Sequence, residues 1–271
     1  MRIILTGSKG FIGKNIHDRL KIYGEEVVEV NYEDCLDFRD TFDEWDTIDM
    51  ILHQGAISST TCTDLNKLHK YNIDYSVWLF EQAIKHQIPV KYASSASVYG
   101  GAAGSHTGFN WTINPLNFYA LSKLTVDYWV QDHMDEFISV QGFRYHNVYG
   151  RGEDNKGNQA SPVHTFSKQA RETGVIKVFE GSDRFLRDFV CVDDVVEVVL
   201  NNDKGSGIYD LGTSQPMSFQ QVAELIAIKF NAKIETIPFP PHLEEKYQKY
   251  TNAIEEFKFY KFKTLEDYLL I

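Results

Sequence analysis

Tyr119 and Lys123 form a pair whose spacing suits proton transfer. They lie in the segment Phe-Tyr-Ala-Leu-Ser-Lys, and residues four apart share one face of a helix. A phenol has a pKa of ~10, so acting as a base near pH 7 requires ~4 kcal/mol of stabilisation of its anion. One cation at ~4 Å supplies ~1 kcal/mol in water and ~4 kcal/mol at an intermediate dielectric constant. Lys123 alone is therefore barely sufficient, and the positive ring of an oxidised nicotinamide is a second contributor to consider.

A serine is expected to complete this group. Residues 94–97 are Ser-Ser-Ala-Ser and follow a predicted strand. Ligands of open α/β sheets bind at the carboxyl ends of the strands. Ser95 is therefore expected to hydrogen-bond the reacting oxygen beside Tyr119 and Lys123.

Three glycines, Gly7, Gly10 and Gly13, follow the first apolar run and precede a helical pattern. Gly7 permits a tight turn, Gly10 lets the backbone approach a pyrophosphate, and Gly13 permits close packing of helix on strand. The helix N-terminus adds N–H donors and the positive end of its dipole. We therefore interpret the pattern as a dinucleotide-binding turn rather than an ordinary strand–helix connection.

The residue expected to contact the adenosine ribose is neutral. Asn31 stands at the end of the second predicted strand, where Asp or Glu usually binds the ribose 2′-OH. A neutral residue does not repel a 2′-phosphate, and Lys9 offers a positive charge to one. We therefore favour NADP as the cofactor and leave NAD open. Asp37 and Phe38, in the predicted loop after this strand, are candidate adenine contacts.

Alternating strands and helices must position these residues. Apolar runs predict strands at 3–5, 26–30, 50–52, 90–93, 139–143, 175–179 and 208–211. Helical spacing predicts helices from the glycine turn to residue 20 and over 64–87, 118–135, 162–173 and 193–200. A further helix starts at Ser218, with Gln221 forming a capping box, and a short one starts at Thr264.

This alternation predicts an α/β fold, a doubly wound parallel sheet of the Rossmann type with a smaller C-terminal substrate lobe. The character of the chain changes after Gly150, where a polar loop begins. We expect residues 1–160 and 188–212 to form the dinucleotide-binding domain. Residues 161–187 and 213–271 are expected to form the substrate lobe.

Composition argues against several other classes of protein. The 271 residues carry 27 Lys and Arg against 38 Asp and Glu, a net charge of −11, so no nucleic-acid partner is expected. Cys35, Cys62 and Cys191 provide neither a disulfide framework nor a four-ligand zinc site, and no metal is expected. No signal-peptide pattern and no ~20-residue apolar run is found, so we expect a cytoplasmic protein without a membrane partner.

Several segments resemble extended short-chain dehydrogenases/reductases of the NAD-dependent epimerase/dehydratase family. The glycine turn and the Tyr119–Lys123 pair are typical of the whole superfamily. Within it, three segments resemble the ADP-L-glycero-D-manno-heptose 6-epimerases: Ser-Ser-Thr-Thr at 58–61, Lys-Gly followed by Ala-Ser within 156–161, and Phe-Glu-Gly-Ser at 179–182. The matching segments are 53–61, 92–101, 114–123, 142–150, 179–182, 187–190 and 247–248, so the resemblance covers nearly the whole chain.

The resemblance implies a nucleotide-sugar epimerase, an isomerase that inverts a carbinol carbon by transient oxidation with bound NAD(P). It implies Tyr119 as one acid/base, Ser95 as the assisting hydroxyl and Lys156 as a second acid/base; Lys156 is alternatively a mobile loop lysine. The implied cofactor contacts are Phe11, Ile12, Gln54, Gly55, Ala56, Ser58, Asn72, Tyr119, Lys123 and Val148. The implied substrate contacts are Ser95, Asn147, Lys156, Asn158, Phe179, Glu180, Gly181, Ser182, Arg187 and Tyr247. A guanidinium such as that of Arg187 suits a diphosphate, and a homo-oligomer is also implied.

Departures from the family pattern leave the sugar open. Asn158 stands where a serine is expected, Gly150-Arg-Gly lacks the usual Pro-Arg, and His164 lies one position from an expected histidine. A UDP-hexose 4-epimerase and an NADP-linked nucleotide-sugar ketoreductase therefore remain alternatives. A 4,6-dehydratase is disfavoured because Ala96-Ser97 replaces its Asp-Glu pair. A cofactor-sensing module would be expected to have lost Tyr119 or Lys123, and both are present.

Overall fold

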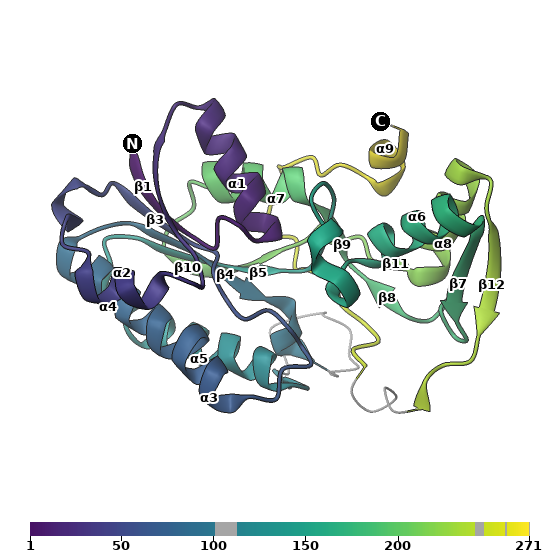
Figure 1. Cartoon of the computed structure of the whole chain (residues 1–271), viewed down its shortest axis with the longest axis horizontal. Coiled ribbons are helices and arrows are strands. Elements are labelled where there is room, and N and C mark those ends of the chain that lie inside the picture. Colours follow the sequence, from purple (N-terminus) through teal and green to yellow (C-terminus); the bar gives the residue numbers. More distant parts are fainter. Residues whose placement is uncertain (101–112, 242–246, 258, 271) are drawn as a thin grey trace. The chain divides into compact units, whose positions relative to one another are not determined.

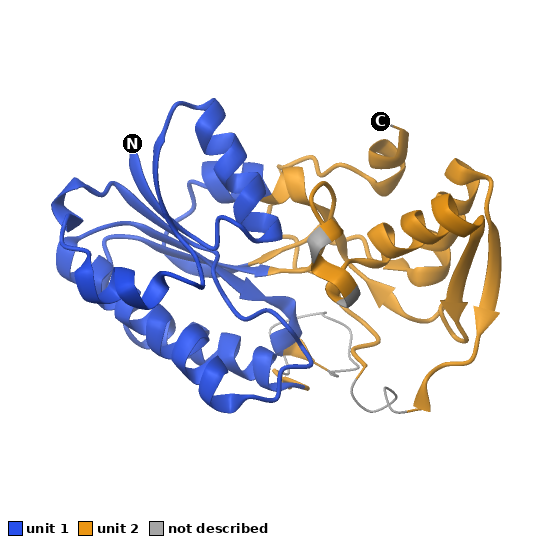
Figure 2. Cartoon of the chain, in the orientation of Figure 1, with its two compact units in different colours: residues 1–98, 117–144, 196–209 blue, residues 99–116, 145–195, 210–271 orange. Residues whose placement is uncertain are grey.

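The computed structural model describes residues 1–100, 113–241, 247–257 and 259–270, without the side chains of residues 155 and 158. The chain forms two compact units (Figure 2). Unit 1 contains residues 1–98, 117–144 and 196–209, and unit 2 contains residues 99–116, 145–195 and 210–271. These bounds differ from those of the domains expected above. The expected domains were divided by the ligand that each would bind, so the division into a dinucleotide-binding domain and a substrate lobe stays a prediction. No helix within the described ranges is long and apolar enough to cross a membrane.

The main element of unit 1 is a six-stranded sheet in the order β10-β5-β4-β3-β1-β2. Its strands are β1 (Arg2–Thr6), β2 (Glu26–Val30), β3 (Met50–His53), β4 (Val90–Ser95), β5 (Val140–Tyr145) and β10 (Gly207–Leu211). β1 pairs in parallel with both β2 and β3, and β3 pairs in parallel with β4. The expected doubly wound sheet is thereby confirmed.

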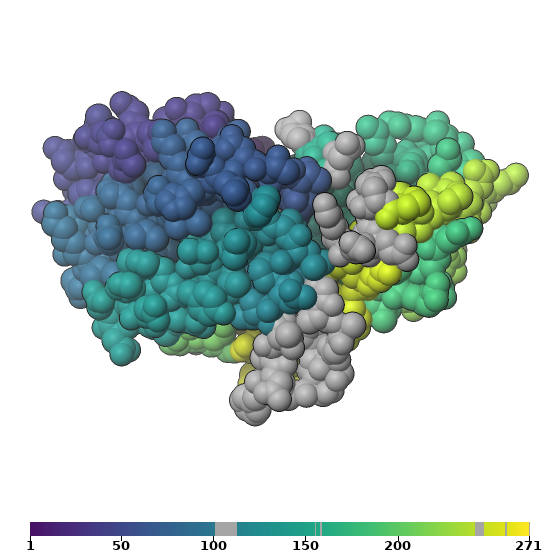
Figure 3. Space-filling view, turned by 90° about the horizontal axis from the view of Figure 1, so that it is seen from below, coloured from purple at the N-terminus to yellow at the C-terminus, as the bar shows by residue number. Residues whose placement is uncertain are grey.

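Helices cover the sheet of unit 1 on both faces (Figure 1). α1 (Phe11–Ile22) lies on one face, and α4 (Tyr75–His86) and α5 (Phe118–Asp132) lie on the other. Ile4 and Ile51 of the sheet and Leu79 and Phe80 of α4 are completely buried in one core cluster. α4 and α5 form a continuous blue-to-teal surface in Figure 3. Burial of these apolar side chains fixes the helices, and with them the helix that carries Tyr119.

Two segments of unit 1 differ from the sequence prediction. The predicted loop after β2 contains α2 (Cys35–Thr41) and the 3₁₀ turn Trp45–Thr47. The predicted helix over 64–87 is three pieces: α3 (Leu65–Leu68), a π-helical stretch η2 (His69–Asp74), and α4. A π-helical stretch changes the phase of the helix, and such stretches are frequent at functional sites.

Unit 2 contains three short two-stranded sheets and its own core. The strand pairs are β7 (Val175–Phe179) with β12 (Lys233–Ile237), β6 (Asn147–Tyr149) with β9 (Phe189–Cys191), and β8 (Leu186–Arg187) with β11 (Met217–Ser218). The helices α6 (Pro162–Thr173) and α8 (Phe219–Phe230) pack on β7 through an apolar cluster, and α9 (Leu265–Leu270) adds Leu265 to it. The predicted capping box of Ser218 and Gln221 is present at the start of α8.

Shorter elements complete the chain. α7 (Val192–Asn201) runs from unit 2 into unit 1. The 3₁₀ turns are Ala96–Tyr99, Met134–Glu136 and Asp154–Gln159. The helix predicted over 118–135 is three residues shorter than expected, because α5 stops at Asp132 and the 3₁₀ turn Met134–Glu136 follows it.

Candidate functional site

The glycine turn of unit 1 leaves no space for a side chain at Gly7 or Gly13. A Cβ atom on Gly7 would lie 2.7 Å from the Cα atom of Gly55, and one on Gly13 would lie 2.0 Å from the Gly7 carbonyl oxygen. Gly7 also has a φ of +71°, which favours glycine. Gly10 precedes α1, and within the described residues no side chain caps the first turn of this helix. The backbone can therefore approach an anionic group at the N-terminus of α1, which fits a dinucleotide pyrophosphate.

Asn31 is held against this turn. Its side-chain oxygen accepts the Lys9 N–H at 3.0 Å, and its side-chain nitrogen donates to the Ser8 hydroxyl at 3.0 Å. The Ser8 hydroxyl in turn donates to Glu29 at 2.7 Å, a contact that lowers the pKa of Glu29. Lys9 Nζ lies 3.6 Å from Glu33. A neutral amide, one cation and two carboxylates thus surround the expected ribose position.

Asp37 and Phe38 lie in α2 and not in a loop, which corrects the sequence prediction. The Phe38 ring stacks on Phe42 with ring centroids 4.5 Å apart and also contacts Trp45 and Trp78 edge-on. Asp37 is exposed. An adenine contact by either residue stays a prediction.

Residues 54–58 follow β3 and contain Gln54, Gly55, Ala56 and Ser58. The Gly55 N–H donates to the Thr6 hydroxyl at 2.9 Å. Asn72, on the π-helical stretch, accepts the Ile57 N–H at 2.8 Å and donates to the Ile57 carbonyl at 3.1 Å. Side chains on β1 and η2 therefore fix the backbone of this predicted cofactor-binding segment.

His53 lies at the end of β3 and was not assigned a role from the sequence. A histidine at the end of a buried strand is the sequence signal that could have identified it. Its Nδ1 lies 2.7 Å from the Thr6 hydroxyl and its Nε2 lies 2.8 Å from the Ser76 hydroxyl. Ser76 donates to the Asn72 carbonyl, so its oxygen must accept from Nε2–H. Nε2 therefore carries a proton, and because burial lowers the pKa of His53 to about 3, the ring is neutral near pH 7.

Ser95, Tyr119 and Lys123 come together in unit 1. α5 begins after Asn117, whose side chain accepts the Ala120 N–H at 2.9 Å, and this cap places Tyr119 in the first turn. Tyr119 is hydrogen-bonded to the Ser95 side chain, and Lys123 Nζ donates to the Ala93 carbonyl at 2.8 Å. β4 thus contacts both members of the pair.

Burial controls the ionisation of this group. It raises the pKa of the Tyr119 phenol, an effect that the Ser95 hydrogen bond opposes and that Asp127 reinforces. Burial also lowers the pKa of Lys123 to about 8, against the opposing effect of Asp127. The net effect of these surroundings is to favour the neutral phenol. Stabilisation of the phenolate by the positive ring of a nicotinamide stays a prediction.

Arg187 is the most enclosed cation among the predicted substrate contacts in unit 2. Its guanidinium lies against the rings of Phe219 and Tyr247, at 5.7 and 5.4 Å from their centroids. Burial lowers its pKa to about 10. Its Nη1 atom is buried and has no hydrogen-bond partner among the described residues. A buried donor of this kind is costly unless it meets an acceptor, so the site fits an anionic ligand.

The other predicted ligand contacts described in unit 2 lie on the turn after β7 and on strand β6. Residues 179–182 form the turn after β7, in which Gly181 has a φ of +80° and the Ser182 hydroxyl donates to Gln220 at 3.1 Å. Asn147 and Val148 lie on β6, parallel to β9. Val148, expected at the cofactor, thus belongs to unit 2 by sequence position. The side chain of Asn158 lies outside the described residues.

Lys156 lies on the 3₁₀ turn Asp154–Gln159 beside a buried carboxylate. Its Nζ atom is 3.8 Å from Glu153, and its side chain is 29% exposed. Glu153 is fixed by the Gly150 N–H at 2.9 Å and by the N–H and hydroxyl of Ser161 at 2.6 and 2.8 Å. Burial lowers the pKa of Lys156, and Glu153 opposes this. Such an ammonium is suited to release a proton.

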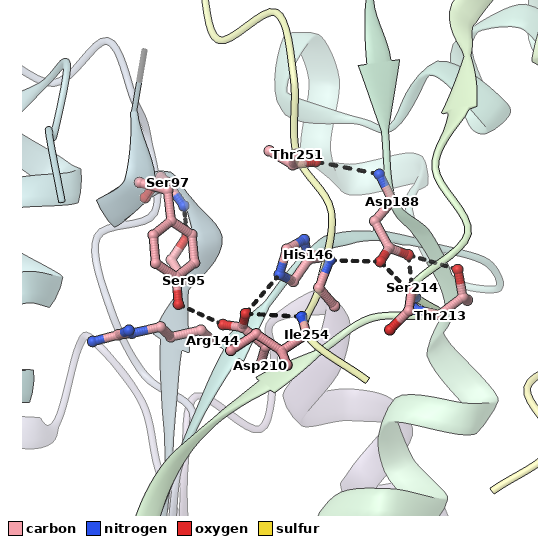
Figure 4. Close-up of polar contacts among 12 residues, drawn as sticks. Ser95, Ser97, Arg144, His146, Asp188, Asp210, Thr213, Ser214, Thr251 and Ile254 are labelled. Carbon is pink, nitrogen blue, oxygen red and sulfur yellow. Dashed lines mark hydrogen bonds and ion pairs between the residues drawn. The ribbon is translucent and has the colours of Figure 1, made fainter. Parts of the chain in front are cut away.

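Two buried aspartates accept hydrogen bonds in unit 2, and one of them, Asp188, lies next to β9 (Figure 4). Asp188 accepts the N–H and hydroxyl of Thr213, both at 2.7 Å, the Ser214 N–H at 2.8 Å and the Ala253 N–H at 2.9 Å. Its own carbonyl accepts the Asn147 N–H at 2.9 Å.

Asp210 is the second buried aspartate. It accepts the Tyr99 hydroxyl at 2.7 Å and lies 3.9 Å from His146 Nε2. Burial would raise its pKa, but the contacts with His146 and Tyr99 outweigh burial and lower it.

Comparison with known proteins is consistent with this geometry. Residues 3–212 match the model of the NAD dependent epimerase/dehydratase family. The chain belongs to this family. It is 39% identical over 284 residues to the ADP-L-glycero-D-manno-heptose-6-epimerase of Alkalilimnicola ehrlichii, covering 93% of this chain and 88% of that protein.

Solved structures show the same fold. The ADP-L-glycero-D-manno-heptose-6-epimerase of Helicobacter pylori has a TM-score of 0.84 at 26% identity, covering 99% of this chain and 94% of that one. The UDP-glucose 4-epimerase of Thermus thermophilus, in complex with NAD, has a TM-score of 0.74 at 20% identity, covering 94% of this chain and 90% of that one.

Proposed function

We propose that this chain is a nucleotide-sugar epimerase that inverts a carbinol carbon by transient oxidation with bound NAD(P). ADP-L-glycero-D-manno-heptose is the substrate we favour, because the curated relative at 39% identity acts on that class of compound according to its name. The observation that carries the proposal is the group of Ser95, Tyr119 and the buried Lys123 at the carboxyl end of β4, in the same unit as the glycine turn.

The dinucleotide supplies hydride removal and return when bound. The protein must hold the cofactor, move the hydroxyl proton and exclude water. Gly7, Gly10 and Gly13 would hold the pyrophosphate, since the turn fits only glycine at Gly7 and Gly13. Tyr119 would take the proton of the reacting hydroxyl and later return it, with Ser95 hydrogen-bonded to its phenol.

Lys123 would stabilise the Tyr119 phenolate and hold it in place. Its Nζ atom is fixed by the Ala93 carbonyl, so the ammonium loses little further freedom when it acts. A positioned acid/base group contributes ~10²–10⁴-fold to the rate of such a step.

The substrate contacts of unit 2 suit a nucleotide diphosphate sugar. The buried Nη1 of Arg187 needs an acceptor, and a diphosphate oxygen provides one. Lys156 is our proposed second acid/base, because its pKa is lowered by burial while Glu153 fixes its location. Asn147 and residues 179–182 are proposed to contact the sugar and nucleotide.

NADP is the cofactor that we propose. The support is Asn31, whose neutral amide stands at the end of β2 and carries no charge to repel a 2′-phosphate, together with the nearby cation of Lys9. Lys9→Ala should weaken NADP binding about tenfold and leave NAD binding unchanged. If the wild type instead binds NAD more tightly, Glu29 and Glu33 select against the 2′-phosphate and the proposal is wrong.

A turnover assay with nucleotide sugars tests the function. The purified protein would be incubated with the ADP-heptose epimers, UDP-glucose and UDP-galactose, and the products identified by NMR. The expected result is interconversion of the heptose epimers. A substrate deuterated at the reacting carbon should keep its deuterium in product, because hydride leaves and returns to the same carbon. Deuterium loss to water would exclude the mechanism, and turnover of UDP-hexoses alone would reassign the substrate. A homo-oligomeric, cytoplasmic enzyme remains our expectation, and light scattering tests the oligomer.

A further inference from the structure

Asp127 is a completely buried carboxylate one helical turn after Lys123 on α5. It accepts hydrogen bonds from three side chains of unit 1: the Tyr92 hydroxyl at 3.0 Å, the Ser94 hydroxyl at 2.9 Å and the Arg144 Nε at 2.8 Å. Tyr92 and Ser94 lie on β4 and Arg144 on β5. This one side chain therefore joins the helix of Tyr119 and Lys123 to two strands of the sheet.

Arg144 makes the contact an ion pair. Its side chain is 12% exposed and that of Asp127 is 0% exposed. Removing one partner of such a buried pair leaves an uncompensated charge, which is far costlier than the pair itself is stabilising. The net charge of the pair is zero, but its two charges come from different elements. The anion, Asp127, is on the same helix as Lys123, whereas the cation, Arg144, is on β5.

The surroundings of Lys123 contain few other charges. His53 of β3 acts on it as a neutral ring, since burial lowers the histidine pKa to about 3. Tyr119 of its own helix and Tyr92 of β4 are phenols whose pKa values burial raises. Within the described part of the chain, Asp127 is the anion whose charge acts on the ammonium of Lys123.

We propose that the buried Asp127–Arg144 pair holds Lys123 as an ammonium ion, which makes Asp127 and Arg144 positioning residues for the reaction proposed above. Burial alone favours the neutral amine, which cannot stabilise a phenolate. Asp127 opposes that effect and keeps the lysine charged. The same carboxylate disfavours the Tyr119 phenolate, and Arg144 limits this cost by neutralising the carboxylate on the strand side.

The proposal predicts opposite effects for the two partners. Asp127→Asn removes the anion and leaves the positive charge of Arg144 in place, so Lys123 should lose its proton at lower pH. Arg144→Gln leaves Asp127 unpaired, so Lys123 should keep its proton to higher pH. The double variant Asp127→Asn/Arg144→Gln removes both charges, so its effect should lie between those of the single variants and below wild type, because the anion that acts on Lys123 is lost. A role limited to packing predicts no such change of sign.

The first measurement is the pH dependence of kcat. The alkaline limb should move down by about one pH unit in Asp127→Asn, because a single nearby charge shifts a pKa by this order. It should move up by a smaller amount in Arg144→Gln, because Arg144 acts on Lys123 through Asp127. In the double variant the limb should lie between those of the two single variants and below that of wild type. Ser94→Ala is the matched control, since it removes a hydrogen bond to Asp127 but no charge, and its limb should not move.

The second measurement does not require turnover. Lysine Nζ groups labelled with ¹⁵N would be titrated by NMR, with Lys123 assigned from the spectrum of Lys123→Arg. Opposite shifts of the Lys123 titration in the two single variants support the pair even if no nucleotide sugar is turned over, in which case only the proposed function fails. If Asp127→Asn does not fold, Arg144→Gln and the double variant still test the sign. Unchanged titrations, or shifts in the same direction, would overturn the proposal.

Discussion

The side-chain amide of Asn72 hydrogen-bonds both backbone groups of Ile57, accepting its N–H at 2.8 Å and donating to its carbonyl at 3.1 Å. The same amide nitrogen donates to the Ser122 hydroxyl at 3.0 Å. Asn72 therefore connects the predicted cofactor-binding segment 54–58 to the helix that carries Tyr119 and Lys123. The π-helical stretch that contains Asn72 lies between these two elements in sequence.

Asn72→Ala is expected to weaken cofactor binding about tenfold. It removes two hydrogen bonds from Ile57, each contributing about 0.5–1.5 kcal/mol, so the segment 54–58 must be ordered on binding. Isothermal titration with NADP and NAD measures the effect. Ser122→Ala removes a different bond of the same amide and should change affinity by less than threefold. Equal losses in both variants would argue against a specific role for the Ile57 contact.

Tyr119→Phe should bind cofactor normally and lose most turnover. The phenyl ring keeps the packing but cannot accept a proton, so kcat should fall by ~10²–10⁴-fold. Steady-state kinetics on the active nucleotide sugar and a cofactor titration measure the two effects. Tyr128→Phe, on the same helix at 51% exposure, is the control. Near-normal turnover of Tyr119→Phe would remove this residue from the proposed mechanism.

Lys156→Met tests the second acid/base. The variant keeps most of the length of the side chain and removes its proton donor, so kcat should fall ~10²-fold. The unfolding temperature should change little, because Glu153 keeps its hydrogen bonds to Gly150 and Ser161. Kinetics and thermal denaturation measure the two outcomes. Lys168→Met, on the exposed side of α6, should leave both unchanged. Full activity of Lys156→Met would mean that Lys156 is an ordinary loop lysine.

His53 should destabilise the protein in acid. Its pKa is about 3 in the folded protein against 6.5 in the unfolded chain, so between these values the unfolded chain binds the proton and the folded protein does not. The free energy of unfolding should therefore fall by about 1.4 kcal/mol for each pH unit below 6.5, and this contribution is fully present above 6.5.

Urea denaturation between pH 7 and pH 4 measures that slope. Glutamine accepts and donates hydrogen bonds without titrating in this range, so His53→Gln should show a shallower dependence on pH than wild type. The exposed His69, replaced by Gln, provides the control for removing a histidine at the surface. Parallel curves for wild type and His53→Gln would contradict the neutral buried ring.

Asp188→Asn should be one of the most destabilising conservative changes in unit 2. An amide nitrogen would face donors that the carboxylate now accepts, and loss of a buried charged acceptor costs about 3–5 kcal/mol. Chemical denaturation measures the change. Thr213→Val removes one of the four donors and should cost about 1 kcal/mol. A loss of less than about 1 kcal/mol for Asp188→Asn would show that the network is not needed for stability.

Local sequence patterns predicted most of unit 1. The apolar runs at 26–30 and 90–93 became β2 and β4, and the glycine turn lies where expected because each step depends on neighbours in sequence. α2 was missed because its seven residues are too few to show a clear helical period. β12 was missed although it alternates in polarity, because its pairing with the distant β7 leaves no mark in the local sequence.

The residues of the candidate site also fall into those predictable from local sequence and those that depend on contacts between distant elements. Tyr119, Lys123 and Ser95 were predicted from spacing and from their place after a strand. Asp127 and His53 were not, because their importance lies in contacts between elements: Asp127 with Arg144 of β5, and His53 with Thr6 and Ser76. A sequence shows that an aspartate follows Lys123 by one turn, but only packing shows that it is buried and paired.

The order of the sheet also bears on how the chain is made. β5 neighbours β10, yet residues 146–195 of unit 2 are synthesised between them. While the ribosome is still translating that stretch, the outer edge of β5 lacks its partner and offers unpaired backbone groups to other nascent chains. A fragment ending near residue 195 is therefore a hazard for aggregation, and folding of the first unit must wait until β10, which ends at Leu211, has been translated.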